Sequence, residues 1–357
     1  MNRTQRRWLI FGFAAGTASG AAALLIRRAQ VVRLARARRV DRITGRIVAG
    51  LGVRAESGFV LVNGLKLHTV VAGPDNGPLA VLLHGFPECW YSWRYQIAPL
   101  VKAGYRVVVP DQRGYNLSAK PPDVESYRLD QLTADVQELV HVFGRERAII
   151  VSHDWGEATA WRLAMDYPDL VEKLIVMNAS HPVAFARELS AGWSQRLKSW
   201  YMLFFQFPWL PETLLTLSPM ASARLFFRRT AVRAGAFSDA DLEVMAASLA
   251  QPGAMRTMIH WYRAAVRYPP ARRTRVIETP TLLIWAEDDV ALGKSLTYGL
   301  EKWVPNLSIH YIPHCGHWVQ NEAPDEVNAQ MLAFVSDHLK KNELQAVPDV
   351  IESDQTM

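Results

Sequence analysis

The sequence contains few cysteines. Only Cys89 and Cys315 occur in 357 residues. Two cysteines cannot form a disulfide framework, and neither has a metal-ligand spacing around it. We therefore expect a protein of a reducing compartment. Half of the residues are hydrophobic, enough to bury a large core. The sequence has no internal repeat.

Acidic residues are almost absent from the first 46 residues. This segment holds eleven arginines and one acid, Asp41, although the net charge of the whole chain is only +6. The remainder of the chain is therefore net negative. Because the basic character does not belong to the main body, we do not expect a nucleic-acid-binding protein.

Charge is also absent from the nineteen residues between Trp8 and Ile26. A membrane-spanning helix needs about 20 residues. A cleaved signal peptide is the alternative, but the run is long for a signal core and Arg27 and Arg28 follow it at once. We expect a retained single-pass anchor, and the arginine excess after it predicts a cytosolic body. Small residues at four-residue spacing predict self-association of this helix through Gly12, Gly16 and Gly20.

The remaining chain alternates short apolar runs with helical patterns. This alternation predicts an α/β fold with a mostly parallel sheet. Around Asn63-Gly64 it predicts a hairpin of Phe59–Val62 with Leu65–Val71. Further strands are predicted at 79–83, 106–109, 148–151, 174–177, 281–285 and 307–311, and helices at 129–143, 158–167 and 324–339.

Between residues 178 and 269 strands disappear, and aromatic residues and helical patterns take their place. We interpret this segment as a helical cap inserted into the α/β core. The predicted organisation is an anchor and basic linker at 1–46, a core at 47–177 and 270–340, the cap at 178–269, and a disordered tail at 341–357.

The run from Ser152 to Gly156 resembles a nucleophile elbow. A predicted strand leads into Ser152-His153-Asp154-Trp155-Gly156, and a helix follows. Small residues on both sides of Asp154 relieve crowding in such a strained turn. A carboxylate at the start of a helix is also favoured by the helix dipole. On this pattern alone, Asp154 fits a nucleophile and a simple helix cap equally well.

A nucleophile needs a base and a group that orients the base. His317 follows the last predicted strand, in His314-Cys315-Gly316-His317-Trp318. Asp288 and Asp289 follow the preceding strand, and we favour Asp289. The chain order nucleophile, acid, histidine is the α/β-hydrolase order. We expect His317 to be the base and His314 to be structural.

The loop after the strand at 79–83 reads His84-Gly85-Phe86-Pro87-Glu88. In α/β-hydrolases this loop supplies one N–H of the oxyanion hole, and the residue after the nucleophile supplies the other. We therefore assign the oxyanion hole to the backbone amides of Phe86 and Trp155. Pro87 fixes the loop, and X–Pro is the bond type that adopts the cis form.

Four motifs together are similar to the epoxide hydrolases of the α/β-hydrolase fold, including membrane-anchored members. They are 84–88, Trp90-Tyr91-Ser92-Trp93-Arg94, Asp111-Gln112-Arg113-Gly114-Tyr115 and 153–156. The resemblance covers about residues 55–340. It implies two lid tyrosines that hold the epoxide oxygen, which we match to Tyr201 and Tyr262, and substrate contacts from Phe86, Pro87 and Trp155.

Two positions depart from the family pattern. Glu157 stands where the family has a small residue, and we expect it to alter helix packing or the electric field around Asp154, and so the turnover rate. Asn116 replaces a glycine after Gly114-Tyr115. Because Asn tolerates the left-handed conformation, we expect that loop to keep its shape.

The resemblance implies hydrolysis of an epoxide through an ester on Asp154, without a metal or organic cofactor. The predicted membrane anchor, in turn, predicts a lipophilic substrate. A haloalkane dehalogenase would use the same triad. That enzyme class needs a further N–H donor for halide where this chain has Phe86, which has none. A non-catalytic scaffold that binds a lipid or a protein is the third reading, although such scaffolds usually lack a triad member.

Overall fold

The computed structural model describes residues 42–191, 193–269 and 274–345. The predicted anchor, with Gly12, Gly16 and Gly20, lies outside these residues. Within them, no helix is long and apolar enough to cross a membrane.

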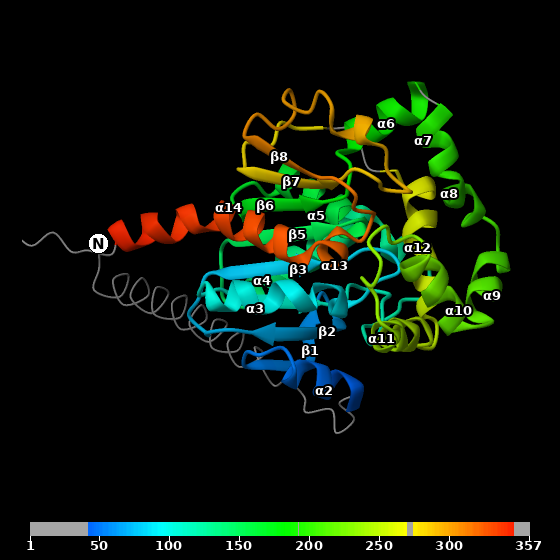
Figure 1. Cartoon of the computed structure of the whole chain (residues 1–357), viewed down its shortest axis with the longest axis horizontal. Helices are drawn as coiled ribbons and strands as arrows, with labels where there is room; N and C mark the ends of the chain where they lie inside the picture. The colour runs from blue at the N-terminus through cyan, green and yellow to red at the C-terminus, as the bar shows by residue number, and fades with distance from the viewer. Residues whose placement is uncertain (1–41, 192, 270–273, 346–357) are drawn as a thin grey trace, which may run out of the picture.

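An eight-stranded sheet forms the centre of the molecule (Figure 1). The strand order is β1-β2-β4-β3-β5-β6-β7-β8; β1 and β2 are antiparallel to their neighbours and the other pairs are parallel. Asn63 and Gly64 both have positive φ and join the predicted hairpin, which is confirmed. The strands are β1 Ala55–Val62, β2 Leu65–Ala72, β3 Leu79–Leu83, β4 Arg106–Pro110, β5 Ala148–His153, β6 Val171–Met177, β7 Thr281–Ala286 and β8 Leu307–Ile312.

Both faces of the sheet are buried because successive strand residues point to opposite sides. In β3, Ala80 and Leu82 contribute to one hydrophobic cluster, and Val81 and Leu83 to the other. The first cluster includes η1 (Trp90–Trp93), α3 (Arg94–Lys102), α13 (Val319–Glu322) and α14 (Pro324–Gln345). The second is covered mainly by α4 (Leu129–Val142) and α5 (Trp155–Asp166), with η4 (Lys294–Thr297) near its edge; η2 (Glu125–Tyr127) precedes α4.

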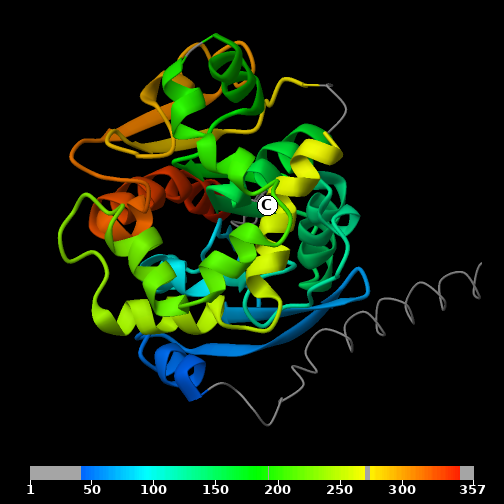
Figure 2. The same cartoon turned by 90° about the vertical axis from the view of Figure 1, so that its right-hand side faces the viewer.

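Helices replace strands between β6 and β7. In Figure 1 they lie as a lid at the right-hand end of the sheet, and in Figure 2 this lid faces the viewer. They are α6 Pro182–Ala191, α7 Trp193–Lys198, α8 Trp200–Phe204, α9 Leu210–Thr216, α10 Pro219–Ala223, the π-helical η3 Arg224–Arg228, α11 Asp239–Leu249 and α12 Ala254–Arg267.

Two predicted boundaries need correction. Helix α2 (Arg42–Ala49) begins inside the segment that we predicted as a linker, because Thr44 and Val48, one turn apart, are buried against the body. Helix α14 continues to Gln345, past the predicted start of the tail at residue 341. The residues after 340 show no hydrophobic periodicity, which is why the sequence did not predict this last stretch of the helix.

Candidate active site

Asp154 occupies the tight turn between β5 and α5. Its φ is 47° and its ψ −125°, a conformation that L residues rarely adopt. Its side chain makes no capping hydrogen bond to α5. Asp154 is therefore not a side-chain cap of α5, and its geometry is that of a nucleophile elbow.

Two glycines make room for this turn. A Cβ on Gly85 would lie 2.3 Å from the Asp154 Cβ, and a Cβ on Gly156 would lie 2.3 Å from the Leu83 carbonyl oxygen. Neither neighbour can move freely, because one is the elbow itself and the other is a buried strand. Any side chain at Gly85 or Gly156 would displace the nucleophile.

The elbow faces His317 and, behind it, Asp289. His317 Nδ1 donates to Asp289 Oδ2 at 2.7 Å, and His317 Nε2 lies 3.6 Å from Asp154 Oδ2. Asp289 is 2 % exposed and His317 5 %. Asp288 and His314 instead form a loose, exposed pair with 3.9 Å between them. The structure thus brings together the three predicted residues, whereas Asp288 and His314 lie at the surface.

Two carboxylates control the protonation of His317. Burial lowers the pKa of the imidazole, but the charge of Asp289 and the hydrogen bonds to Asp154 and Asp289 outweigh this and hold it well above its usual value. On Asp289, burial raises the pKa, yet His317 and the Asn178 amide bring it below its ordinary value. Both carboxylates therefore favour the protonated form of His317.

Asn178 is a site residue that the sequence did not reveal. It follows β6 with a φ of 42°, and its Nδ2 donates to Asp289 Oδ2 at 2.7 Å. Its Oδ1 accepts from the Ala286 backbone at 2.7 Å. Because Asn178 thus fixes both Asp289 and the end of β7, it orients the acid that orients His317.

The predicted oxyanion loop lies over the elbow. The Phe86 backbone N–H donates to Asp154 Oδ1 at 2.6 Å. The Phe86–Pro87 bond is cis, in line with the loop prediction. Trp155 is the first residue of α5, so its backbone N–H has no partner within the helix. This N–H is available to a bound substrate.

The two predicted lid tyrosines face each other above Asp154. The rings of Tyr201, on α8, and Tyr262, on α12, lie 5.9 Å apart. Burial raises the pKa of both phenols far beyond the ordinary value, and the charge of Asp154 adds to the effect. Both hydroxyls therefore stay protonated and can donate to an oxygen that develops negative charge near Asp154.

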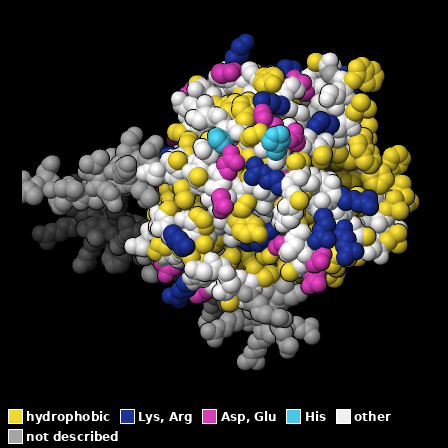
Figure 3. Space-filling view, viewed as in Figure 1, with side chains coloured by type: hydrophobic (Ala, Val, Ile, Leu, Met, Phe, Trp, Pro, Cys, Tyr) yellow, Lys and Arg dark blue, Asp and Glu magenta, His cyan; other side chains and the backbone are white. Residues whose placement is uncertain are grey.

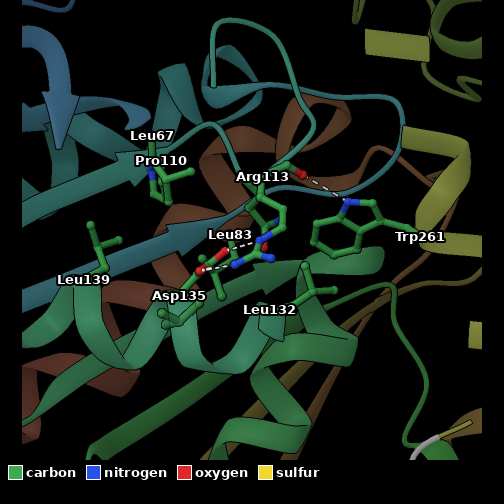
Figure 4. A pocket seen from close by; sticks show the side chains of 10 residues that line it. Leu67, Leu83, Pro110, Arg113, Leu132, Asp135, Leu139 and Trp261 are labelled. Atoms are coloured by element: carbon green, nitrogen blue, oxygen red, sulfur yellow. Dashed lines mark hydrogen bonds and ion pairs between the residues drawn. The ribbon is translucent and has the colours of Figure 1, made fainter. Parts of the chain in front are cut away.

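A buried ion pair holds α12 in place (Figure 4). Arg113 makes two hydrogen bonds to Asp135, of 2.6 and 2.7 Å, and its carbonyl accepts from Trp261 Nε1 at 3.1 Å. The small cavity beside this pair is lined by residues of β2, β3, β4, the loop after β4, α4 and α12, and neither Asp154 nor His317 lines it. It is therefore a packing gap behind the active site, and Trp261 tethers Tyr262 to the core.

Glu88 and His153 form a second buried network that the sequence did not reveal. His153 Nδ1 donates to Glu88 Oε2 at 2.7 Å, and His153 Nε2 lies 2.8 Å from the His317 carbonyl oxygen. Burial alone would raise the pKa of Glu88, but His153 and the Gly85 amide bring it down to about 2. The network fixes the backbone of His317 relative to the oxyanion loop. The long sequence separations of these contacts explain why spacing could not find them.

Comparisons with known proteins agree with this geometry. The family described as alpha/beta hydrolase fold matches residues 78–324. The AB hydrolase superfamily protein YfhM of Bacillus subtilis is 40% identical over 284 residues, covering 80% of this chain and 98% of YfhM. Epoxide hydrolase 3 of Mus musculus is 38% identical and covers 78% of this chain and 76% of its own. An epoxide hydrolase of Bacillus megaterium, solved in complex with an inhibitor, gives a TM-score of 0.73 at 32% identity, with 78% and 99% of the two chains covered.

This chain belongs to the epoxide hydrolases of the α/β-hydrolase fold. The predicted fold class and family are confirmed. In this chain, Asp154, Asp289 and His317 follow one another in the order typical of α/β-hydrolases.

Glu157 is the departure inside the elbow helix. Its Oε2 accepts from Trp161 Nε1 at 2.6 Å. Burial raises the pKa of this carboxyl well above its usual value, and the charge of Asp154 raises it further. Glu157 is thereby held toward its neutral form, which spares Asp154 from a second negative charge one turn away. The expected disturbance of Asp154 is thus reduced by protonation.

Replacing Glu157 with Gln is expected to stabilise the protein as the pH rises. The folded pKa of Glu157 is raised above its unfolded value. Folding of the wild type is therefore not penalised below the unfolded pKa, and the protein loses stability as the pH rises from the unfolded pKa toward the folded one. Gln cannot ionise, so the difference in Tm between Glu157→Gln and wild type should grow from about pH 5 to about pH 8. Thermal unfolding at several pH values checks this. An exposed acid, Glu301→Gln, is the control and should give a pH-independent difference.

Proposed function

We propose that this epoxide hydrolase converts an epoxide to a vicinal diol through an ester on Asp154. The observation that carries the proposal is a carboxylate elbow placed between His317 and two protonated tyrosines. A carboxylate nucleophile suits displacement at a saturated carbon, and the tyrosines suit an oxygen leaving group.

In the first step, an oxygen of Asp154 attacks an epoxide carbon and the carbon–oxygen bond of the ring breaks. Because the Phe86 N–H holds Oδ1, Oδ2 is the oxygen free to attack. Tyr201 and Tyr262 hydrogen-bond the ring oxygen, and one of the two hydroxyls transfers its proton to that oxygen as the bond breaks. The product is a hydroxyalkyl ester of Asp154.

Esterification then changes His317. It removes the negative charge and the hydrogen bond with which Asp154 helped to raise the pKa of the imidazole. His317 can therefore return a proton to the tyrosine that protonated the ring oxygen, and it can then accept one from water. The hydroxide attacks the Asp154 Cγ, and the oxyanion formed at Oδ1 receives hydrogen bonds from the Phe86 and Trp155 amides. The diol leaves, and one carboxylate oxygen now derives from water.

An isotope experiment tests this ester. A single turnover in ¹⁸O water with a lipophilic epoxide should place the label in the peptide that contains Asp154, and not in the diol. Mass spectrometry of that peptide is the measurement. Diol production over repeated turnovers without any label in Asp154 would rule out the ester mechanism and point to direct attack by water.

A haloalkane dehalogenase is the competing function because it would share Asp154 and His317. Against it, the Phe86 ring packs 5.1 Å from Tyr262 and offers no N–H to a halide. Both tyrosine hydroxyls also favour an oxygen leaving group. Incubation with a chloroalkane is the discriminating assay, and halide release at a rate comparable to epoxide opening would favour the dehalogenase. A scaffold without activity would hydrolyse neither compound.

Removal of the tyrosine hydroxyls is expected to slow ester formation. Loss of one donor to a developing oxyanion typically costs about 10²–10³-fold in rate. Tyr201→Phe and Tyr262→Phe should each lower the rate of alkylation by roughly this factor, and the double variant by more. Pre-steady-state kinetics of Asp154 modification measures it. Tyr95→Phe, at a half-exposed position outside the site, should leave the rate unchanged.

The lining of the site favours a lipophilic epoxide. Phe86 lies edge to face with both Phe205, at 5.2 Å, and Phe226, at 5.6 Å. Trp155 packs at 4.9 Å from Tyr262. The three phenyl rings can give a substrate only apolar contact, and Trp155 adds a single indole N–H to this largely apolar wall. Pro87, the residue after Phe86, is also buried. The proposed reaction needs no metal or organic cofactor.

We further propose that the run Trp8–Ile26 anchors the chain in a membrane with the enzyme body on the cytosolic side. The supporting observations are its length, its lack of charge and the arginines that follow it. The glycines Gly12, Gly16 and Gly20 would let two such helices approach closely. Extraction of membranes at alkaline pH and protease protection of the body test the anchor and its orientation. Release of the full chain by alkaline buffer would refute it.

A further inference from the structure

The outward side of the lid carries large apolar side chains. We define the outer lid face as six residues of helices α7, α8 and α9 and their ends, each between 63 % and 79 % exposed. Figure 3 shows hydrophobic side chains gathered at the right-hand edge, over the place where Figure 1 labels these helices. Soluble proteins rarely leave such side chains grouped in water unless they bind a partner. The residues are Trp193, Leu197, Trp200, Leu203, Trp209 and Leu217.

Helix α8 links this face to the active site. Trp200 and Leu203 are 63 % and 74 % exposed, whereas Tyr201 points inward and packs on Tyr262. Phe205, at the end of the same helix, is 3 % exposed and contacts Phe86. The packing of the inner side therefore explains Tyr201 and Phe205, but nothing in the described residues explains the apolar outer side.

Basic residues outnumber acidic ones in the segment that carries the outer lid face. Residues 189–237 contain six Lys or Arg and a single acid, Glu212. Glu212 is engaged by Arg263, at 2.5 Å, and points toward α12. Arg196, Arg224 and Arg229 are exposed, and Arg196 lies 5.6 Å above the Trp193 ring. The body beyond the N-terminal segment is net negative, so this excess is local.

We propose that the outer lid face docks on the surface of an anionic lipid bilayer. Tryptophan is enriched at the interface of membranes, where its apolar ring enters the acyl boundary and its N–H stays near the headgroups. The arginines at the border supply the attraction to anionic lipids. The inference does not depend on the reaction at Asp154 or on the N-terminal run.

A second copy of the chain is the other occupant that an apolar face suggests. In a two-fold dimer the same patch would meet itself, which would bring the exposed arginines of both copies into one interface. Like charges facing each other across an interface oppose association. An anionic bilayer instead neutralises them. The charge pattern therefore favours the lipid surface.

Docking in this orientation would place the active site close to the apolar phase. Trp200 and Leu203 would lie in the bilayer, one and two residues from Tyr201 along α8. A lipophilic epoxide dissolved in the membrane would then reach the aromatic wall around Phe86 from the side of the lid, without crossing bulk water.

A site-specific fluorescent label tests the orientation in the full chain. Cys89 and Cys315 are both buried, so an introduced surface cysteine reacts alone. Leu203→Cys carries the label at the outer lid face. Leu61→Cys, 54 % exposed on β1, carries it on the body as the matched control. Both variants keep the N-terminal run, so any anchoring by that run acts equally on both.

The probe is a vesicle of phosphatidylcholine and phosphatidylglycerol, with bromine on the lipid acyl chains as quencher. The label at position 203 should shift its emission to the blue and lose most of it to the bromolipids, while the label at 61 should not. Vesicles of phosphatidylcholine alone should quench position 203 less. Replacing Arg196, Arg224 and Arg229 with Glu in the labelled chain should abolish the difference between the two lipids.

Three outcomes would overturn the proposal. They are equal emission of both labels, quenching at 61 rather than at 203, and a blue shift at 203 that appears without vesicles and grows with protein concentration. The last result would assign the outer lid face to a second copy of the chain. Epoxide turnover by each labelled variant in detergent verifies that its fold is intact.

Discussion

Asp154→Ala is expected to lower epoxide turnover by roughly 10⁴-fold or more, which is the scale seen when a nucleophile is removed from a catalytic triad. The elbow holds this carboxylate with a positive φ, over the Phe86 amide and 3.6 Å from His317. Alanine keeps the turn but leaves no atom to attack the epoxide carbon. Steady-state assays of diol formation measure the loss, with the melting temperature as the check on folding.

The matched control is Asp288→Ala. Asp288 lies one residue from the acid of the triad, but its side chain is exposed and reaches only the exposed His314. We therefore expect this variant to turn over epoxide as wild type does. Should Asp154→Ala keep substantial activity while Asp288→Ala loses it, the assignment of both the nucleophile and the acid would fall.

The sequence predictions succeeded where a feature depends on residues that are close together in the chain. The elbow, the hairpin at Asn63-Gly64 and the strand β3 were predicted because each depends on a few consecutive residues. Asn116 was expected to keep the loop that contains it, and with a φ of 39° it does, while its Nδ2 donates to Asp111 at 2.8 Å. Local turn chemistry is thus legible in a sequence.

Features that rest on distant contacts were missed. Asn178 lies 111 residues from Asp289, and Glu88 lies 65 residues from His153. Neither residue is distinguished in the sequence from many other Asn and Glu residues. Helix α2 escaped prediction because its amphipathic pattern merges with the arginine-rich segment before it. These elements are specified by tertiary packing, which composition and periodicity do not record.

The same distinction explains why the members of the triad could be predicted from the sequence, whereas their pKa shifts could not. Chain order and strand ends placed Asp154, Asp289 and His317 on one edge of a parallel sheet. The raised pKa of His317 depends on burial between two carboxylates, and the raised pKa of Glu157 depends on its burial. Burial of this kind is a property of the folded chain.

His317→Gln is expected to trap the ester. Gln keeps about the volume of the imidazole but cannot accept a proton from water, so hydrolysis of the ester should slow by roughly 10²–10⁴-fold, the usual scale of general base catalysis. Alkylation needs only Asp154 and the two tyrosines, and it should continue. Intact-mass spectrometry should then find one equivalent of epoxide added to the chain, within the peptide that contains Asp154. His314→Gln, at an exposed position, should accumulate no adduct and turn over normally.

If His317→Gln lost turnover without any adduct, His317 would be needed for the attack on the epoxide itself, and the roles assigned to His317 in the two steps would have to be reversed. The raised pKa of His317 argues against that result, because the charges of Asp154 and Asp289 favour the protonated imidazole until the ester has formed.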